Sequence, residues 1–343
     1  MVGGRKLVGW TAALVIAVLA VGAAELVRAD REPDGQRAVS IVERATTTTT
    51  APTTTAPPTT AAPTTTTAPR PVIPDALVPI VAGEAAVAAA EPVALAEQIV
   101  QAEMAIRDPN TTPEVLAAAG RLQQVAYRRL GENPAWEQEV FAHTPPELHE
   151  SIWRQATARR EFRAMHTRLG ENLPAWRIVE PLPAEELLAI YREAEARFGV
   201  PWNVLAAVNL VETAMGRIVG LSSAGAQGPM QFMPPTWEAY GMGGDVWDTH
   251  DAVMGAANYL AANGGNRGTA DGVANALFHY NRSNHYVRGV MHYAEVMRLE
   301  PHTFLGLHAW PVMFATAHGD IVLPTGYEQL QPIPVLDWLA ANS

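Results

Sequence analysis

One glutamate in the chain occupies a position suited to acid–base chemistry. Glu212 lies in a predicted helix over Asn203–Ala214 and shares one face with the residues at i−3, i−4 and i−7, namely Asn209, Val208 and Leu205. Its carboxyl group is expected on the apolar side and, judged from Gly216, near the C-terminal end, where the helix dipole opposes negative charge. Burial and the dipole both favour the protonated form, which a general acid needs near neutral pH. The same periodicity also fits a glutamate at the helix edge whose carboxylate reaches solvent.

The segment that follows could hold an extended ligand. Between Gly220 and Pro235 small residues come first, and then Gln227, Met230 and Gln231 stand among glycines and prolines. This pattern predicts a loop followed by a turn of helix that begins near Pro229. Glycines let backbone amides approach a ligand closely, and the Gln231 amide offers a donor and an acceptor. A plain surface loop is the alternative interpretation.

Farther along the chain, helices are predicted over Asp251–Ala262 and Val273–Tyr280. The second helix runs into the segment His279–Tyr286, which combines aromatic residues with Asn and Ser. Rings stack on the apolar faces of sugars, and amides pair with hydroxyl and acetamide groups, so this segment fits one wall of a sugar-binding cleft. Helix capping and core packing account for the same residues equally well.

These segments together resemble the lytic transglycosylases of bacterial cell walls. Four motifs carry the resemblance, in order along the chain: Val211-Glu-Thr with Gly216-Arg217, Ser222-Ser-Ala-Gly-Ala226, Gly228-Pro-Met-Gln231 with Phe232-Met-Pro234, and Tyr280-Asn-Arg-Ser283 with Tyr286. They are most similar to the membrane-bound type B branch, and the Gly-x-Met-Gln stretch is also similar to the soluble type. The motifs cover roughly a fifth of the chain.

The resemblance implies an α-helical, lysozyme-like domain that cleaves the β-1,4 bond between N-acetylmuramic acid and N-acetylglucosamine, without a cofactor. Glu212 matches the single catalytic acid of the family. It protonates the glycosidic oxygen and then, as a carboxylate, takes the proton of the muramyl C6 hydroxyl, which leaves a 1,6-anhydro end. Because that nucleophile belongs to the substrate, a second carboxylate is unnecessary. The resemblance implies that six motif residues bind the substrate: Ser222, Gln231, Tyr280, Asn281, Tyr286 and, by similarity to the soluble type alone, Met230.

The chain departs from the type B pattern in two places. It has four residues between Arg217 and Ser222, where that branch carries a longer insertion, which implies a more open cleft. Related enzymes can hold an acidic calcium loop, but Asp245, Asp248 and Asp251 are too few for the roughly 6 to 8 oxygen ligands of calcium. We therefore expect no metal, and we expect these aspartates to cap a helix and form turns.

Two other kinds of active site are disfavoured. His279, His285 and His292 lie in one segment, but no carboxylate pattern accompanies them and their spacing does not match a zinc enzyme. Ser222 and Ser223 lack the Gly-x-Ser-x-Gly frame of a serine hydrolase. The chain contains no cysteine, which excludes disulfides, thiolate metal sites and a cysteine nucleophile.

The N-terminal part of the chain predicts export. Residues 1–28 contain Arg5 and Lys6 followed by an uncharged run from Leu7 to Ala24, which fits either an uncleaved membrane anchor or a cleaved signal peptide. In both cases the basic flank stays in the cytoplasm and the rest of the chain is extracytoplasmic. Residues 29–74 include a tract of only Thr, Ala and Pro, which predicts a disordered, semi-rigid linker whose glycosylation is undecided.

The remaining regions frame the motifs. Residues 75–180 are Ala-rich with helical periodicity, and the stretches Arg129–Trp136 and Arg168–Trp176 are similar, so we expect a duplicated helical hairpin. Gly131 and Gly170 are expected to end its helices, and the proline after each to begin the next helix. Residues 181–304 form the expected catalytic domain, which starts with an amphipathic helix over Ala184–Phe198. In the extension over 305–343, apolar runs around a Gly-Asp pair predict a small β-hairpin.

The fold class expected is therefore mainly α. The net charge of −11 disfavours nucleic acid as a partner and indicates that peptidoglycan glycan strands are recognised locally in the cleft. The helical region is expected either to be a structural or spacing module or to bind a partner, such as cell-wall or division proteins, or glycan. Two other functions stay open: a lysozyme that uses water in place of the C6 hydroxyl, and a non-catalytic protein that binds or organises the cell wall.

Overall fold

The structure is a computed structural model that describes residues 80, 86–165 and 169–342. The predicted anchor or signal over 1–28 and the predicted linker over 29–74 lie outside the described residues. Among the described residues, no helix combines the length and the apolar character that crossing a membrane requires.

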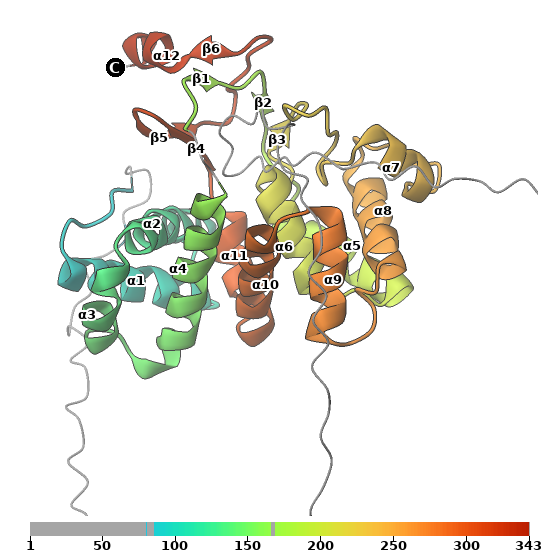
Figure 1. The fold of residues 1–343 in the computed structure, drawn as a ribbon. Helices are drawn as coiled ribbons and strands as arrows, with labels where there is room; N and C mark the ends of the chain where they lie inside the picture. The colour runs from blue at the N-terminus through green and yellow to red at the C-terminus, as the bar shows by residue number, and fades with distance from the viewer. Residues whose placement is uncertain (1–79, 81–85, 166–168, 343) are drawn as a thin grey trace, which may run out of the picture. The chain divides into compact units, whose positions relative to one another are not determined.

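The prediction of a mainly helical protein is confirmed (Figure 1). Twelve α-helices lie in the described part of the chain: α1 (Pro92–Arg107), α2 (Pro113–Glu132), α3 (Glu137–Ala142), α4 (His149–Ala164), α5 (Ala184–Phe198), α6 (Trp202–Thr213), α7 (Pro234–Tyr240), α8 (Thr249–Ala262), α9 (Ala270–Tyr280), α10 (Asn284–Leu299), α11 (Thr303–His308) and α12 (Val335–Ala341). Helix α5 has the bounds that its periodicity predicts, and it ends at Gly199, whose φ of 73° is the left-handed conformation that glycine adopts readily.

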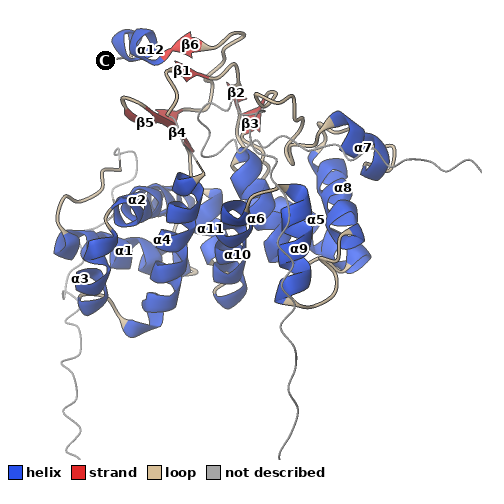
Figure 2. Cartoon of the chain, viewed as in Figure 1, coloured by secondary structure: helices blue, strands red, loops and turns tan. Residues whose placement is uncertain are grey.

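Six short strands gather at one end of the helices (Figure 2). They are β1 (Asn172–Leu173), β2 (Arg177–Ile178), β3 (Ile218–Val219), β4 (Val312–Thr316), β5 (Gly319–Leu323) and β6 (Ile333–Pro334). They pair as three two-stranded antiparallel sheets, β1 with β6, β2 with β3 and β4 with β5. The β4–β5 pair is the predicted C-terminal hairpin, with Thr316 opposite Gly319 at its turn.

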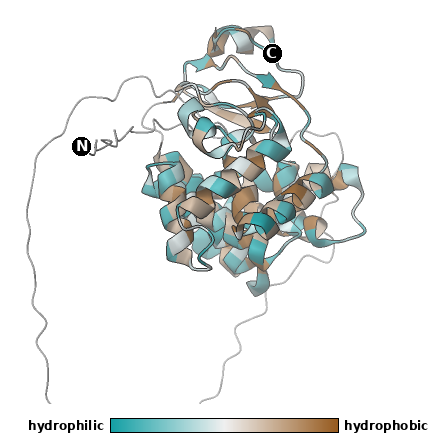
Figure 3. Cartoon of the chain, turned by 90° about the vertical axis from the view of Figure 1, so that its right-hand side faces the viewer, coloured by the Kyte–Doolittle hydropathy of each residue, from teal (hydrophilic) through white to brown (hydrophobic). Residues whose placement is uncertain are grey.

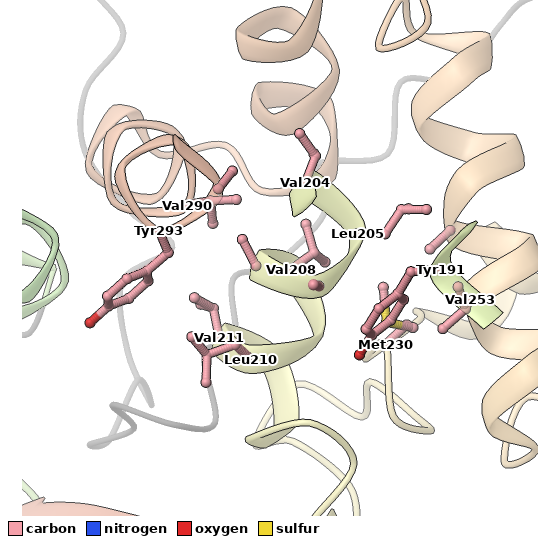
Figure 4. Packing of buried hydrophobic residues seen from close by; sticks show 14 of the residues in the cluster. Tyr191, Val204, Leu205, Val208, Leu210, Val211, Met230, Val253, Val290 and Tyr293 are labelled. Atoms are coloured by element: carbon pink, nitrogen blue, oxygen red, sulfur yellow. The ribbon is translucent and has the colours of Figure 1, made fainter. Parts of the chain in front are cut away.

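Helix α6 lies at the centre of the largest hydrophobic core, and all of its residues are buried. Val204, Val208 and Val211 face Val290 and Tyr293 of α10, while Tyr191 of α5 and Val253 of α8 lie on another side of the helix (Figure 4). The hydropathy colouring shows hydrophobic segments concentrated in the interior of the helical body (Figure 3). A helix that is apolar on nearly every side is stable in water only when neighbours surround it.

Helices on the two sides of the predicted boundary near residue 180 pack against each other, although the helices before it also have a smaller core of their own. Phe162 of α4 stacks on Tyr293 of α10 with ring centroids 5.8 Å apart. A Cβ atom added to Gly289 would lie 2.5 Å from the Phe162 ring, so the close approach of the two helices requires a glycine there. Helices α4 and α10 therefore join the region over 75–180 to the segment that carries the motifs.

The two copies of the sequence repeat adopt different structures, which corrects the expected duplicated hairpin. In the first copy Gly131 does not end a helix but lies inside α2, where an added Cβ would be 3.0 Å from the Cβ of Arg159 in α4. Pro134 does begin the short 3₁₀ helix Pro134–Trp136. In the second copy Gly170 forms a β-bridge with Thr316, and the residues that follow form β1 and β2, because the C-terminal part of the chain offers strand partners there.

A buried carboxylate holds α1, α2 and α4 together. Glu103 of α1 is fully buried, and its Oε1 accepts hydrogen bonds from Gln123 (3.0 Å), Tyr127 (2.7 Å) and Gln155 (3.0 Å). Its Oε2 pairs with Arg107 at 3.0 Å. The donors of Gln123 and Tyr127 lose this partner if the carboxylate is removed, whereas Gln155 keeps a second hydrogen bond to Ser151 Oγ at 3.2 Å. A buried donor without a partner is costly.

We predict that Glu103→Ala lowers the free energy of unfolding by about 3 kcal/mol, because it leaves the buried donors of Gln123 and Tyr127 unpaired and takes the counter-charge from the partly buried Arg107. Urea denaturation of the two proteins measures the difference. The matched control is Glu97→Ala, an exposed glutamate of the same helix, for which we expect a change below about 0.5 kcal/mol. Equal effects of the two substitutions would refute the role given to the Glu103 network.

Candidate active site

The Glu212 carboxyl group lies in the last turn of α6 and is nearly removed from solvent, with 2% of the residue exposed. The Tyr286 hydroxyl of α10 donates a hydrogen bond of 2.7 Å to its Oε1. Burial raises the pKa of Glu212 to about 8, and the Tyr286 hydrogen bond acts against this shift. Glu212 is therefore predominantly protonated at neutral pH, as a proton donor must be.

The hydrogen bond that the described structure gives the Glu212 carboxyl group is the one from Tyr286, at Oε1. Tyr286 thus holds one oxygen, while the other is free to donate its proton to a ligand. No second carboxylate of the described residues is among the groups that influence the pKa of Glu212. The arrangement supplies one acid, held in place by one tyrosine.

A second tyrosine connects this group to the loop that follows α6. The Tyr280 hydroxyl donates a hydrogen bond of 2.6 Å to the main-chain oxygen of Met230. Burial first, and then the charge of a deprotonated Glu212, raise the pKa values of both Tyr280 and Tyr286. Both hydroxyls accordingly stay protonated and act as donors across the neutral range.

Two side chains at the end of α6 hold the loop in place by hydrogen bonds. The sequence did not predict this role for them. The Asn209 amide nitrogen (2.8 Å) and the Thr213 hydroxyl (2.6 Å) both donate to the main-chain oxygen of Pro229. The Tyr191 hydroxyl in turn donates to Asn209 Oδ1 at 2.6 Å. Two signals pointed to these residues in the sequence: Thr213 stands next to Glu212 in the motif, and Asn209 shares the helix face of Glu212.

The loop itself differs from its prediction in one respect. Residues Gly228–Gln231 form a turn, which the main-chain N–H of Gln231 closes by donating a hydrogen bond of 3.0 Å to Gly228 O. The next helix, α7, begins only at Pro234. Gln231 has a φ of 49°, which ends any helical path there. An added Cβ on Gly228 would lie 1.8 Å from Val246 O, so this position requires glycine.

The remaining predicted binding residues lie near these elements in different environments. Ser222 is buried and its hydroxyl accepts a hydrogen bond from Ala226 N at 2.8 Å, which closes the first turn of the loop. The Gln231 side chain is buried and donates to Gly228 O at 3.0 Å. Met230 is fully buried in the main core, so its side chain packs within the protein. Asn281 is buried, and its Oδ1 has no hydrogen-bond partner among the described residues, which leaves an acceptor for a ligand N–H or O–H.

Hydrogen bonds thus join Glu212 to Tyr286, and Tyr280 to the loop at Met230. The charge of a deprotonated Glu212 is also among the causes that raise the pKa values of Tyr280 and Tyr286. For Ser222, Gln231 and Asn281, no hydrogen bond to Glu212 occurs in the described structure. Their part in substrate binding stays a prediction.

The aspartates near residue 248 cap a helix and form turns, as expected. Asp248 is the N-cap of α8 and accepts from Asp251 N at 2.9 Å. Asp251 accepts from Asp245 N, and Asp245 accepts from Trp247 N, both at 2.9 Å. Possible ligand atoms of Asp248, His250 and Asp251 lie within 4.8 Å of one another, and these three residues are exposed or partly exposed.

The three histidines of the C-terminal helical segment have different surroundings. His285 pairs with Glu161 at 2.7 Å, and His292 lies edge-on to the Trp153 ring, with centroids 5.1 Å apart. Burial lowers the pKa of His279 and of His292. The described part of the chain holds one group of three potential metal ligands, around Asp248, and these histidines are not in it.

The raised pKa of Glu212 predicts how stability depends on pH. Between the ordinary value of 4.5 and about 8 the unfolded chain releases the Glu212 proton while the folded protein retains it, so this group costs increasing stability as pH rises. We expect Glu212→Gln to become progressively more stable than the wild type over this interval, as measured by thermal denaturation at a series of pH values. Glu186→Gln, which changes an exposed glutamate of α5, should show no such trend. A constant difference between wild type and Glu212→Gln would contradict the buried, protonated state.

Comparisons with protein-family models, with curated proteins and with solved structures find no match to this chain. A functional assignment therefore depends on the chemistry of the residues around Glu212.

Proposed function

We propose that the protein is a peptidoglycan lytic transglycosylase with a lysozyme-like helical catalytic domain. The observation that carries the proposal is the Glu212 carboxyl group, buried at the end of α6, held by Tyr286 and protonated at neutral pH. The motifs around it, which resemble those of lytic transglycosylases, support the same substrate: glycan strands of alternating N-acetylmuramic acid and N-acetylglucosamine.

The reaction needs one group that acts first as an acid and then as a base. Glu212 donates its proton to the glycosidic oxygen as the bond to the muramyl C1 breaks. The resulting carboxylate then accepts the proton of the C6 hydroxyl while the C6 oxygen bonds to C1, so the product carries a 1,6-anhydro ring and no water is consumed. Because the nucleophile is part of the substrate, its attack is favoured over that of a separate water molecule.

Tyr286 suits this change of role. A hydrogen bond to the carboxylate stabilises the charged form that follows proton transfer, while burial stabilises the neutral form that precedes it. The two influences together give a pKa of about 8, close to a neutral working pH, where one group both gives and takes a proton efficiently.

The proposal extends to the place of action. The basic flank and apolar run before Glu25, followed by the Thr-, Ala- and Pro-rich tract, support an exported protein that is either tethered to the membrane or secreted to the cell wall. In this proposal the tract spaces the catalytic domain away from the membrane.

We predict that digestion of purified peptidoglycan releases muropeptides with 1,6-anhydro ends, each one water lighter than the corresponding reducing end. Glu212→Gln should lower the rate about 10²- to 10⁴-fold, the usual contribution of a general acid, while Glu186→Gln retains it. Mass spectrometry of the products measures both. Reducing ends would identify a hydrolytic lysozyme instead, and peptidoglycan left intact by wild type would favour a non-catalytic role in the cell wall.

A second prediction concerns the pH profile. Activity requires protonated Glu212 and should fall as pH rises through about 8. Tyr286→Phe removes the hydrogen bond that lowers the pKa of Glu212, so the alkaline limb should move to higher pH, as measured by initial rates across the range. Tyr327→Phe is the control, because this buried tyrosine donates to Pro174 O in the core that contains the β4–β5 hairpin. A profile of Tyr286→Phe that coincides with that of wild type would exclude the role given to this hydrogen bond.

A further inference from the structure

An arginine-lined cavity lies where α2, α4 and the β4–β5 hairpin meet. It has a volume of about 660 Å³. Five arginines line it, two from α2 and three from α4: Arg128, Arg129, Arg159, Arg160 and Arg163. The acidic residues of the lining are Glu132 and Asp320, so the cavity carries an excess of positive charge in a chain whose net charge is −11.

Two of the arginines that line the cavity are buried. Arg128 and Arg159 are each 7% exposed. Burial first, and then the charge of Arg159, lower the pKa of Arg128 to about 10. Asp320 of β5 pairs with Arg128. No carboxylate among the described residues pairs with Arg159, so the buried pair carries one positive charge more than its counter-charge.

Both buried arginines also have unused donors. Arg128 Nη1 and Arg159 Nε are buried and have no hydrogen-bond partner within the described structure. Buried polar groups are almost always hydrogen-bonded, and an arginine cannot lose its charge to avoid the cost as a lysine can. Arg128 and Arg159, which carry these donors, both line the cavity, so their unmet hydrogen bonds point to an acceptor that comes from outside the chain.

Of the other three arginines that line the cavity, one forms an ion pair with a carboxylate and two form none among the described residues. Arg160 pairs with Glu137 at 2.6 Å. Arg129 and Arg163 take part in no ion pair of the described residues; Arg129 is half-buried and Arg163 is exposed at the rim. Three positive charges without a carboxylate thus face one cavity, those of Arg129, Arg159 and Arg163.

The cavity is built on rigid elements. At Gly131 the backbone of α2 approaches α4 so closely that an added Cβ would lie 3.0 Å from Arg159 Cβ. Thr316 at the hairpin turn forms a bridge with Gly170, and its hydroxyl donates to Gly319 O at 2.6 Å. Arginines held by packed helices lose less freedom when they bind than arginines on a mobile loop.

We propose that this cavity is a binding site for a multivalent oxyanion, a ligand whose phosphate or carboxylate groups accept hydrogen bonds from Arg128, Arg129 and Arg159. The planar guanidinium fork matches both groups in bidentate geometry. The site is built by residues outside the motifs around Glu212, and the proposal does not depend on the reaction assigned to Glu212.

Calorimetric titration of the full chain tests the proposal with two probes, inorganic phosphate and the dicarboxylate succinate. We expect saturable binding of at least one probe, with an affinity that falls as salt rises. The probe that binds more tightly identifies the class of oxyanion. Absence of saturable binding of both probes would overturn the proposal.

Substitutions locate the site. Arg129→Gln and Arg159→Gln should each weaken binding about tenfold, the effect of losing one charged hydrogen bond. The control is Arg267→Gln, an exposed arginine between α8 and α9 without an ion pair in the described structure, which should retain the wild-type affinity. If Arg267→Gln weakens binding as much as the cavity variants do, binding reflects general charge and the proposal is wrong.

Arg163→Gln provides a variant that cannot disturb the core, because its side chain lies at the exposed rim. We expect it to weaken binding by several-fold while its thermal denaturation in the absence of the probe matches that of wild type. The probe should also raise the melting temperature of wild type more than that of Arg159→Gln, which reports binding even if that variant is less stable. Equal rises in the two proteins would place the oxyanion elsewhere.

Discussion

The removal of the Glu212 carboxyl group from water sets the requirements that the surrounding structure meets. A carboxyl group keeps a proton near neutral pH only where water is excluded, so the end of α6 has to be enclosed. Helices α5, α8 and α10 provide that enclosure, and α10 also brings the tyrosine. The same contacts that make α6 stable therefore set the chemistry of its glutamate.

The loop after α6 depends on that helix as well. Asn209 and Thr213 both hold the Pro229 carbonyl, and Tyr191 orients Asn209. The chain leaves α6 through Ala214, Met215 and Gly216, all with positive φ. Left-handed conformations at Ala and Met cost on the order of 1 kcal/mol each and persist only where surrounding contacts enforce them. Here the buried polar network and the core enforce them, so the position of the acid and the path of the loop are specified together.

The sequence predicted those features that depend on neighbours along the chain. The periodicity of α5 gave its bounds, and apolar runs around a Gly-Asp pair indicated the C-terminal hairpin. The face of Glu212 was predicted, but the enclosure of α6 on all sides was not, because that depends on helices far along the chain. Gly131 was predicted to end a helix, but the glycine is needed there because α4 packs closely against it. The second repeat copy was predicted to be helical, but it pairs with β6, a strand that comes about 160 residues later in the chain. The turn at Gln231 likewise depends on long-range contacts of Gly228 with Val246.

Burial has opposite consequences at the two sites because the two kinds of side chain respond differently to it. Burial raises the pKa of Glu212 to about 8, so the carboxyl group keeps its proton and is mostly neutral at pH 7. Burial lowers the pKa of Arg128 only to about 10, so this arginine stays charged, and charges of this kind need an anion. Asp320 supplies one for Arg128, and the Nε donor of Arg159 is left without a partner among the described residues. The net charge of the chain predicts neither the protonation of Glu212 nor the unmet hydrogen bonds of the buried arginines. Both depend on how many opposite charges lie within hydrogen-bonding distance of the buried group.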